Sequence, residues 1–548
     1  MAVAVAVAVA VAVAVAVCVG LAAVLPPVPA MAAPARSWRL VAPTGQPSTV
    51  AATVRIDTGG RLTLEVRRGS TVVVAPSAMG VRTSGADLRS GLTFASRADT
   101  HVTQQYTTAA GRRRAHTVDA NQTTLRFSKG GSRLDLLVRV SADGVGYRYV
   151  VGRSGQVTVV GEASEFAVPT AARAYLLPYD NGRNDYESLY EHTTVATAAP
   201  VGYGYPSLFH VGDSWLLITE SDVNGNYGAS RLTLDRSSHR FRLTLPDAQE
   251  TAAGPLTTPW RVLVVGDLRT VTESDLVTDL ATPSKVADPS WIKPGRLAWS
   301  WWSNGPSSRS LSEQKRYADY AGAQGWEYIL VDSGWSATWM PELITYARQR
   351  DVGVLPWVRG AEMIHNKPGR PPFPVDYYTT LPFTRNLAGS MDFTPVTFTA
   401  VRLISDAAEL ALSVVFESGI QNFADSIDTY AAYPPAQRFL REVPSAWDET
   451  RLLSGDPDSH VVLARQRGAQ WFVGAVTAGP ARTVEATLDF LAAGAWLADS
   501  YADGPGGRIT TRTQQVTNTD ALSIAVPPNG GFAVQLCPAA AGATTCAS

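Results

Sequence analysis

The middle of the chain contains a short series of strand-like segments that restricts the fold more than any other feature. An aromatic segment, Arg296-Leu-Ala-Trp-Ser-Trp-Trp302, is followed by Tyr328-Ile-Leu-Val-Asp-Ser-Gly-Trp335 and Gly353-Val-Leu-Pro-Trp-Val358. Residues 314–324 and 341–350, between these segments, have helical patterns. Strands that alternate with helices form parallel sheets, so this part of the chain predicts successive strands of a (β/α)₈ barrel.

The barrel predicted from this pattern is too short to be complete. A (β/α)₈ barrel usually takes about 250 residues, and only residues 290–443 are available for it here. After Val358 the chain continues without a helix into Arg359-Gly-Ala-Glu-Met363, which is typical of an active-site loop. We therefore expect an incomplete barrel of about five strands. Its unpaired edges and exposed apolar faces should lower the stability of the chain and favour aggregation.

The two regions that flank the barrel segment are rich in β patterns. Residues 36–288 contain alternating or β-branched runs separated by glycine-rich turns, which fit one large β-sandwich. Residues 444–540 contain a second set of such runs and predict a small antiparallel sandwich. The expected fold is a multidomain β plus α/β protein: an N-terminal β-sandwich, an incomplete barrel and a C-terminal β-sandwich.

The N-terminal residues have the features of an export signal. Residues 1–32 are an alternation of Ala and Val that ends in Ala30-Met31-Ala32, a small-x-small cleavage site. A membrane anchor is the alternative, because the apolar run is long enough to cross a bilayer. We expect a secreted, extracellular protein without a stable membrane anchor.

Charge and cysteine content narrow the classes of partner and cofactor. Lys and Arg number 47 against 48 Asp and Glu, without a basic run, which argues against nucleic acid as a partner. After removal of the leader only Cys537 and Cys546 remain, and they form one disulfide or stay as two thiols. Two cysteines without a cluster do not make a zinc site. The 14 Trp and 19 Tyr side chains suit either sugar stacking or a packed core.

Carboxylates are the natural candidates for chemistry, because the seven His are scattered singly. Glu362 follows a strand-like run, where barrel enzymes place catalytic groups, and Arg359 could orient it. An ordinary ion pair in a loop is the alternative for these two residues. Glu220 follows the strand-like run Ser214-Trp-Leu-Leu-Ile-Thr219 and precedes a loop with many oxygen ligands, which suits either Ca²⁺ or a solvated turn.

Four further residues are candidate contacts for a substrate. Asp332 and Trp335 follow the second barrel strand, where Asp332 could bind a sugar hydroxyl or cap the next segment. Asp392 and Glu417 are also expected at strand ends, either as substrate contacts or as salt bridges of the barrel rim.

Several of these segments together resemble glycoside hydrolase family 97. The resemblance extends over nearly the whole chain after the leader, and its longest part, residues 371–389, is specific rather than generic. The other matching segments are Trp215-Leu-Leu-Ile-Thr-Glu-Ser-Asp222, Trp299-Ser-Trp-Trp302, Tyr328-Ile-Leu-Val-Asp-Ser-Gly-Trp335, Arg359-Gly-Ala-Glu362 and Trp447-Asp-Glu-Thr-Arg451. The resemblance implies an N-terminal β-super-sandwich, a catalytic (β/α)₈ barrel and a C-terminal β-sandwich. It also implies hydrolysis of α-glycosidic bonds with Ca²⁺ at the active site.

The resemblance assigns roles to individual residues. Glu362 matches the proton-donating glutamate of the family, and Glu220 matches a calcium-binding glutamate that reaches in from the N-terminal sandwich. We expect both glutamates to contribute to a calcium site. The expected ligand is an α-linked oligosaccharide or glycoside, bound by a monomer.

The chain departs from the family pattern near Val358-Arg359. Pro356 stands where the family has a calcium-binding glutamate, and the strand that carries the nucleophilic aspartate of retaining members has no counterpart. By this comparison about three strand–helix units are missing, on the order of 100 residues. We therefore expect a calcium-dependent glycosidase by lineage, of α-glucosidase or α-galactosidase type, with little hydrolytic activity as written. A non-catalytic carbohydrate-binding relic and a faulty gene model are the alternatives.

Overall fold

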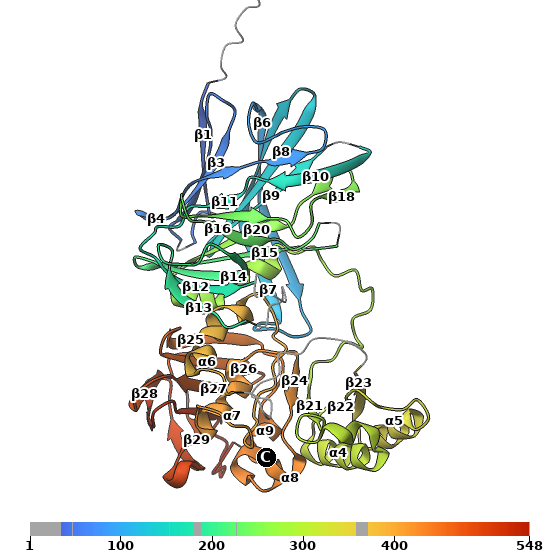
Figure 1. Ribbon diagram of the computed structural model, residues 1–548. Helices are drawn as coiled ribbons and strands as arrows, with labels where there is room; N and C mark the ends of the chain where they lie inside the picture. The colour runs from blue at the N-terminus through green and yellow to red at the C-terminus, as the bar shows by residue number, and fades with distance from the viewer. Residues whose placement is uncertain are drawn as a thin grey trace, which may run out of the picture.

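The computed structural model describes residues 34–46, 48–152, 154–179, 188–225, 227–357 and 371–546. The predicted leader and two predicted site residues, Arg359 and Glu362, lie outside these ranges. Figure 1 shows an N-terminal β domain stacked on a C-terminal β domain, with a small parallel sheet and its helices beside the latter. No helix in the described ranges is long and apolar enough to span a membrane.

The N-terminal domain is a sandwich of antiparallel strands, as the sequence predicts. Its main layer is a 13-stranded sheet, and two smaller sheets of four and three strands pack against it. The main layer contains β6 (Thr93–Thr107), β7 (Ala115–Lys129), β8 (Ser132–Ser141), β9 (Gly144–Val151), β11 (Glu165–Phe166), β12 (Arg173–Pro178), β13 (Glu191–Thr194), β14 (Gly202–Val211), β15 (Ser214–Ser221), β16 (Arg231–Asp235), β17 (Arg240–Thr244), β19 (Leu256–Thr257) and β20 (Trp260–Gly266). The smaller sheets contain β1 (Arg36–Val41), β2 (Val50–Ile56), β3 (Leu62–Arg68) and β4 (Thr71–Met79), and β5 (Val81–Thr83), β10 (Gln156–Glu162) and β18 (Glu250–Ala253).

Alternate residues of β15 face opposite sides of the main layer, because successive side chains of a strand point to opposite faces. Leu216 and Ile218 belong to the core inside the sandwich. Trp215 and Leu217 belong to a second core, which the domain shares with the C-terminal half of the chain. Both faces of this strand are therefore buried, each against a different part of the protein.

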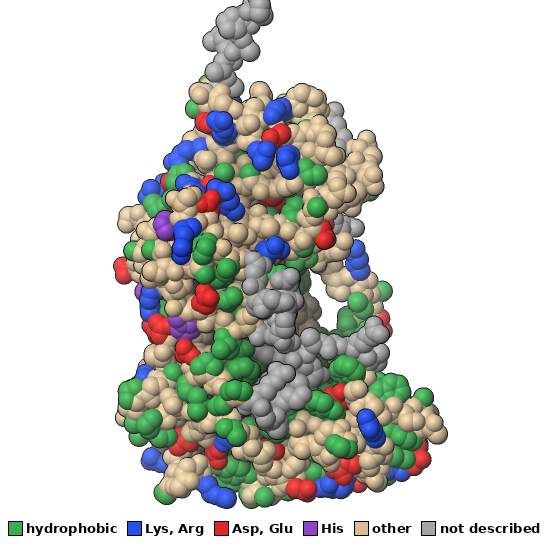
Figure 2. Space-filling view, in the orientation of Figure 1, with side chains coloured by type: hydrophobic (Ala, Val, Ile, Leu, Met, Phe, Trp, Pro, Cys, Tyr) green, Lys and Arg blue, Asp and Glu red, His purple; other side chains and the backbone are tan. Residues whose placement is uncertain are grey.

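An extended linker connects the N-terminal domain to the parallel sheet. Two short helices, α2 (Leu268–Glu273) and α3 (Leu276–Asp279), end the domain, and residues 281–293 then run exposed to solvent without helix or strand. Figure 1 shows this segment passing beside the molecule to the parallel sheet, and the space-filling view of Figure 2 shows a gap between it and the body of the molecule. Trp291 on the linker is 71% exposed, so packing contributes little to holding the linker in place.

Four parallel strands in the order β23-β22-β21-β24 form the barrel segment. They are β21 (Gly295–Trp299), β22 (Tyr328–Val331), β23 (Gly353–Pro356) and β24 (Ile420–Phe423). Two helices, α4 (Leu311–Gln324) and α5 (Met340–Arg348), cover one face of the sheet and confirm the two predicted helices. The side chain of Ser310 caps α4 by accepting a hydrogen bond from the Glu313 amide, and Gly325 ends it with a φ of 66°, which glycine adopts without steric cost.

The described residues form an open parallel sheet rather than a closed barrel. We expected about five strands, and four are present in the described ranges. Residues 390–399 lie along β24, where a fifth strand would be, but they form no ladder with it. Met391 N donates to Glu417 O (3.0 Å) and Asn422 Nδ2 donates to Asp392 Oδ1 (3.2 Å) along this boundary.

One face of the parallel sheet stays partly open to solvent. Leu297 and Trp299 are buried on this face. Four other residues that pack on it are only half-buried: Tyr328, Leu330, Leu355 and Ile420. The corresponding face of a closed (β/α)₈ barrel is a packed core, and the four described strands do not enclose it by themselves.

The C-terminal domain is a small antiparallel sandwich, in agreement with the sequence pattern. A six-stranded sheet in the order β25-β26-β27-β32-β29-β30 packs against the pair β28-β31. The strands are β25 (Glu449–Asp456), β26 (His460–Arg467), β27 (Gln470–Thr477), β28 (Arg482–Thr487), β29 (Trp496–Asp503), β30 (Ile509–Val516), β31 (Ala521–Val526) and β32 (Gly531–Pro538). Cys537 and Cys546 form a disulfide, which decides between the two alternatives for these cysteines.

Helix α7 (Asp406–Val415) lies against the C-terminal sheet, and its residues from Ala407 to Val415 are all buried. Two glycines of the sheet allow the close approach. A Cβ added to Gly474 would lie 2.9 Å from the Ala411 carbonyl oxygen, and one added to Gly531 would lie 2.8 Å from the Ala408 Cα. The remaining helical segments are α6 (Val375–Thr380), α8 (Ile427–Ala431), α9 (Pro434–Glu442), η1 (Gly305–Arg309), η2 (Leu381–Phe383), η3 (Arg385–Leu387) and η4 (Pro505–Gly507).

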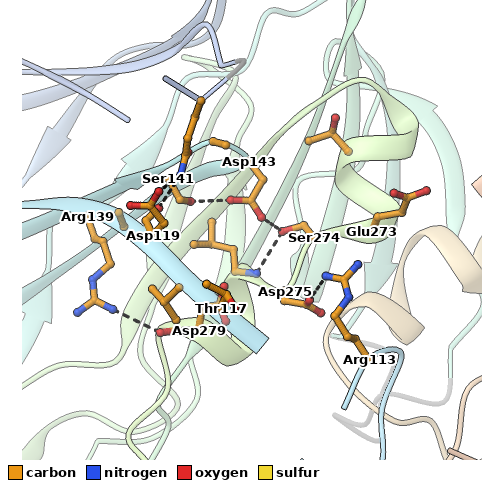
Figure 3. Close-up of a pocket in the computed structure, with 16 residues that line it drawn as sticks. Arg113, Thr117, Asp119, Arg139, Ser141, Asp143, Glu273, Ser274, Asp275 and Asp279 are labelled. Atoms are coloured by element: carbon orange, nitrogen blue, oxygen red, sulfur yellow. Dashed lines mark hydrogen bonds and ion pairs between the residues drawn. The ribbon is translucent and has the colours of Figure 1, made fainter. Parts of the chain in front are cut away.

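A cavity of about 320 Å³ lies in the N-terminal domain between the main sheet and α3 (Figure 3). The carboxylates that line it are bound by neighbouring side chains: Asp275 pairs with Arg113 (2.6 Å), and Asp279 accepts a hydrogen bond from the Tyr106 hydroxyl (2.7 Å). Burial raises the pKa of the Asp279 carboxyl to about 6, and the nearby carboxylates of Asp275 and Asp143 add to this shift.

Limited trypsin digestion of the folded protein should cut the linker after Lys285, because this residue is exposed and lies in irregular backbone. The two fragments should elute together in gel filtration, since the second core and the ion pair between Arg114 and Asp448 (2.5 Å) join them without the linker. Lys285→Ala is the control and should resist this cleavage. Fragments that separate under native conditions would show that the linker holds the domains together.

The Asp279 carboxyl should make the stability of the fold depend on pH. Its folded pKa of about 6 lies above the ordinary value of 3.8, so the stabilisation that the bound proton provides is full below about pH 4 and is lost as the pH rises through 6. Asp279→Asn keeps an acceptor for Tyr106 without a charge. It should stabilise the protein relative to wild type at about pH 8, by roughly 2 kcal/mol, and much less at about pH 4. Thermal unfolding across this range measures the difference, with the exposed Asp247→Asn as control, and a pH-independent difference contradicts the assignment.

Candidate functional site

The C-terminal edge of the parallel sheet is the candidate active site. Enzymes of the (β/α)₈ type take their catalytic groups from residues that follow the strands, at this edge. The residues in that position are Ser300 after β21, Asp332 after β22, Trp357 after β23 and Asp425 near the end of β24. The edge therefore combines two carboxylates with aromatic side chains. The cavity of Figure 3 is not part of this candidate site, because it lies in the N-terminal domain.

Asp332 lies at this edge, as predicted, but its carboxylate already has partners. The residue is 6% exposed, its Oδ2 accepts a hydrogen bond from Trp299 Nε1 at 2.9 Å, and its Oδ1 accepts one from the Ser333 amide. The Trp299 ring in turn stacks on Trp301, with 5.9 Å between ring centroids and 15° between planes. Asp332 therefore orients an aromatic pair.

Trp335 fixes the loop after β22 to the end of β23. Its indole Nε1 donates a hydrogen bond to the Trp357 carbonyl oxygen at 2.9 Å. Trp335 and Trp357 are both half-buried, so each keeps some contact with solvent. Flat, partly exposed aromatic rings beside polar groups suit the binding of sugars.

Asp425 is a site residue that our sequence analysis did not single out. It follows Ile420-Gln-Asn-Phe-Ala424 and is 1% exposed. Its carboxylate accepts hydrogen bonds from the Thr399 amide (2.9 Å) and hydroxyl (2.7 Å), and burial raises its pKa. The rule that selected Asp332, a carboxylate just after an apolar strand, also fits Asp425.

Asp392, another predicted contact residue, is exposed to solvent. Its Oδ1 accepts a hydrogen bond from Asn422 Nδ2 on β24. Partial desolvation by the surrounding protein raises the pKa of the Asp392 carboxyl, and the Arg385 guanidinium opposes this effect. Asp392 lies in the irregular segment along β24 rather than at the end of a strand, and it can accept a hydrogen bond from a ligand.

Glu417 lies at the N-terminal edge of the sheet, beside Met391 and Asp392 and opposite the edge that holds Asp332, so its predicted position at a strand end was wrong. The run Val414-Val-Phe416 is the end of α7, and Glu417 precedes β24 instead of following a strand. The residue is 1% exposed, and its carboxylate accepts hydrogen bonds from the Ser390 hydroxyl (2.9 and 3.0 Å). Burial raises the pKa of Glu417, and the charges of Arg465 and Arg112 oppose that shift. Glu417 therefore belongs to the junction between domains.

Glu220 points into the N-terminal sandwich. It follows Leu216 and Ile218 on the side of β15 that faces the sandwich core. Its carboxylate pairs with Arg261 and accepts hydrogen bonds from the backbone amide (2.9 Å) and hydroxyl of Ser230. This arrangement does not bring Glu220 to the edge of the parallel sheet, where a metal could meet the substrate.

The described residues do not fit a Ca²⁺ ion by themselves. Calcium takes six to eight oxygen ligands in most protein sites. In the described ranges, no group of three or more His, Cys, Asp or Glu side chains could hold a metal ion. Pro356, the last residue of β23, has no side-chain ligand, and the other predicted ligand, Glu362, falls outside the described residues.

Two family models match this chain. The model described as "Glycosyl-hydrolase 97 N-terminal" matches residues 44–283, and the one described as "Glycosyl-hydrolase 97 C-terminal, oligomerisation" matches residues 446–537. These two regions correspond to the N-terminal and C-terminal sandwiches.

Two relatives match the sequence over most of its length. A probable retaining alpha-galactosidase of Streptomyces bingchenggensis is 38% identical over 624 residues, covering 96% of this chain and 97% of the relative. A retaining alpha-galactosidase of Bacteroides thetaiotaomicron is 25% identical over 568 residues, covering 76% of this chain and 85% of the relative. Both alignments are longer than the 548 residues of this chain, so they include positions of the relatives that have no counterpart here.

Solved structures share the fold. A glycoside hydrolase family 97 enzyme from Pseudoalteromonas sp. strain K8, in complex with acarbose, has a TM-score of 0.82 at 22% identity, covering 92% of this chain and 100% of that chain. A beta-arabinopyranosidase has a TM-score of 0.81 at 22% identity, covering 91% of this chain and 100% of that chain. With the family models and the 38% identical relative, these similarities show that the chain belongs to glycoside hydrolase family 97.

Proposed function

We propose that this chain recognises α-linked glycosides at the C-terminal edge of its parallel sheet, and that α-galactosides are the first to test. The observation that carries the proposal is the similarity to a probable retaining alpha-galactosidase over 96% of the chain. The aromatic and carboxylate side chains at this edge supply the stacking surfaces and hydrogen-bond acceptors that sugars need. The acarbose and panose complexes of related enzymes support α-linked oligosaccharides as the wider ligand class.

In this proposal each group has a separate task, and Asp392 acts from beside β24 rather than from the C-terminal edge. Asp392 accepts a hydrogen bond from a sugar hydroxyl, and the rings of Trp301 and Trp335 stack on the sugar. Glu362, by its resemblance to the proton-donating glutamate of the family, protonates the departing glycosidic oxygen, and Arg359 orients it. A retaining mechanism also needs a nucleophilic carboxylate about 5–5.5 Å from the acid.

The two carboxylates at the C-terminal edge offer no free nucleophile for that second task, and the exposed Asp392 lies beside β24 instead. Asp332 is bound by Trp299, and Asp425 is bound by Thr399. Both side chains are buried. We therefore propose that hydrolysis by this chain is slow compared with its relatives.

Carbohydrate binding without hydrolysis is the second candidate function. The partly open face of the parallel sheet favours it, because Tyr328, Leu330 and Leu355 keep contact with solvent there. This surface lies next to Asp392 and Asn422, which supply polar contacts. An open sheet face can receive the side of an oligosaccharide, whereas a closed barrel admits one only at its mouth.

Three further properties belong to the proposal. Export is supported by the predicted leader and by the disulfide between Cys537 and Cys546, since disulfides persist in oxidising compartments. An oligomer is favoured over the expected monomer by the description of the family model for the C-terminal domain. Dependence on Ca²⁺ stays a prediction from the resemblance. Calcium titration of wild type and Glu220→Gln tests whether Glu220 takes part in it.

Turnover of 4-nitrophenyl α-galactoside in calcium buffer tests the hydrolytic part of the proposal. We expect little turnover by the wild type, because a general acid alone typically contributes about 10²–10⁴-fold, against 10⁶–10¹⁷-fold for complete enzymes. Glu362→Gln should remove what activity is present. Brisk turnover by the wild type that is lost in Glu362→Gln would mean that another carboxylate serves as nucleophile.

Isothermal titration with an α-galactosyl oligosaccharide tests recognition independently of turnover. Trp301→Ala should weaken binding roughly tenfold, which corresponds to about 1.4 kcal/mol. The control is Trp291→Ala, which removes a 71% exposed indole from the linker and should leave the affinity unchanged. Equal affinities for wild type and Trp301→Ala would place the sugar elsewhere.

A further inference from the structure

Three charged side chains from two layers of the N-terminal sandwich meet in its interior. Glu220 on β15 lies directly opposite Arg261 on β20 in the main layer, and Glu162 belongs to β10 in the three-stranded sheet. The Arg261 guanidinium donates to both oxygens of Glu162, with Nη2 at 2.6 Å and Nε at 3.0 Å, and its Nη1 donates to Glu220 Oε1. We call this group the buried triad; its side chains are 5% exposed or less.

Hydroxyl and amide groups complete the hydrogen bonds of the buried triad. Ser230 donates from its amide to Glu220 Oε2 and from its hydroxyl to Glu220 Oε1. Tyr227 and Ser164 donate their hydroxyls to Glu162, at 3.0 and 2.6 Å. Both oxygens of each carboxylate therefore accept hydrogen bonds from protein groups, and a cation could bind Glu220 only by displacing them.

The orientation of β15 keeps the Glu220 carboxylate away from the parallel sheet. Residues 216, 218 and 220 face the inside of the sandwich, and residues 215 and 217 face the core shared with the C-terminal half of the chain. Moving Glu220 to the other face would require a one-residue slip of β15, which would also reverse its apolar side chains. The direction of the carboxylate is thus set by the packing of the whole strand.

We infer that Glu220 is not a calcium ligand in this protein, but one arm of a buried ion triad that joins the two layers of the N-terminal sandwich. The polar contact between the two layers then depends on Glu162, Arg261 and Glu220 and not on Ca²⁺ bound at Glu220. The inference concerns folding and metal binding, so it stands or falls independently of the proposed glycosidase activity.

The first experiment follows thermal unfolding of the full-length wild type in EDTA and in millimolar-range Ca²⁺. We expect Ca²⁺ to change the Tm of wild type and of Glu220→Gln equally, because no calcium site includes Glu220. Calorimetric titration with Ca²⁺ on wild type and Glu220→Gln checks the same point without unfolding. A Tm that rises with Ca²⁺ in wild type and not in Glu220→Gln, or tight Ca²⁺ binding that this substitution removes, overturns the inference.

The second experiment tests the structural role of the buried triad. Arg261→Met leaves two buried carboxylates without their counter-ion, and removal of one partner from a buried pair typically raises the unfolding constant by about 100-fold or more. The matched control is Glu342→Gln, which breaks the exposed pair between Glu342 and Lys315 (2.5 Å) and should change stability little. If Arg261→Met is as stable as the control, the inference fails.

Arg261→Met could also prevent folding altogether, and the milder Glu162→Gln covers that case. It keeps the size of the side chain and removes one charge, so it should lower the Tm by more than Glu342→Gln while leaving circular dichroism native. A Tm equal to that of the control would contradict the structural role. The calcium titrations of wild type and Glu220→Gln decide the metal-binding half of the inference whatever these variants do.

Discussion

The arrangement of the domains depends on one apolar core that they share. Trp215 and Leu217 of β15 enter this core from the N-terminal sandwich, Leu412 of α7 from the middle of the chain, and Leu452 and Leu463 from the C-terminal sheet. The long β6–β7 hairpin adds polar contacts at the same junction, where Arg112 donates to the Thr272 carbonyl oxygen (2.8 Å) and its own carbonyl oxygen accepts from the Thr450 hydroxyl (2.8 Å). Because burial of apolar surface is the main favourable term in folding, this core joins the two sandwiches without any residue of the four parallel strands.

Because the parallel strands do not contribute to the shared core, the two sandwiches can pack together although the parallel sheet has only four described strands. Helices α4 and α5 cover its outer face, α7 anchors the following segment on the C-terminal sheet, and residues 390–399 lie along β24. The opposite face, which carries Tyr328, Leu330 and Leu355, has no covering helices in the described ranges, and these side chains stay half-buried. In the described residues only four strands bring side chains to the C-terminal edge, whereas each strand of a closed barrel would bring further ones there.

The sequence predicted the strands and helices of the middle segment well because their period and turn residues are local properties. The capping Ser310 and the terminal Gly325 illustrate this, as both act within one turn of α4. Glu417 was misplaced because Val414-Val-Phe416 is apolar and β-branched, and a short apolar run does not distinguish a buried strand from the end of a buried helix. Asp425 was missed although the strand-end rule selects it, and Arg359 and Glu362 lie outside the described residues.

Glu220 separates most clearly what the sequence determined from what the tertiary structure decided. Alternation along β15 already places Glu220 on the side of Leu216 and Ile218, so its direction relative to its own strand could be read from the sequence. Only the folded protein shows which side is the sandwich interior, because that depends on β20 bringing Arg261 opposite Glu220 and on β10 bringing Glu162 from another layer. The sequence by itself determined the order of the domains, the strand and helix periods and the family resemblance, all of which depend on neighbouring residues. The partners of the two carboxylates in the buried triad were decided by contacts between residues up to 99 positions apart, and a buried charge takes its role from the partners that the fold supplies.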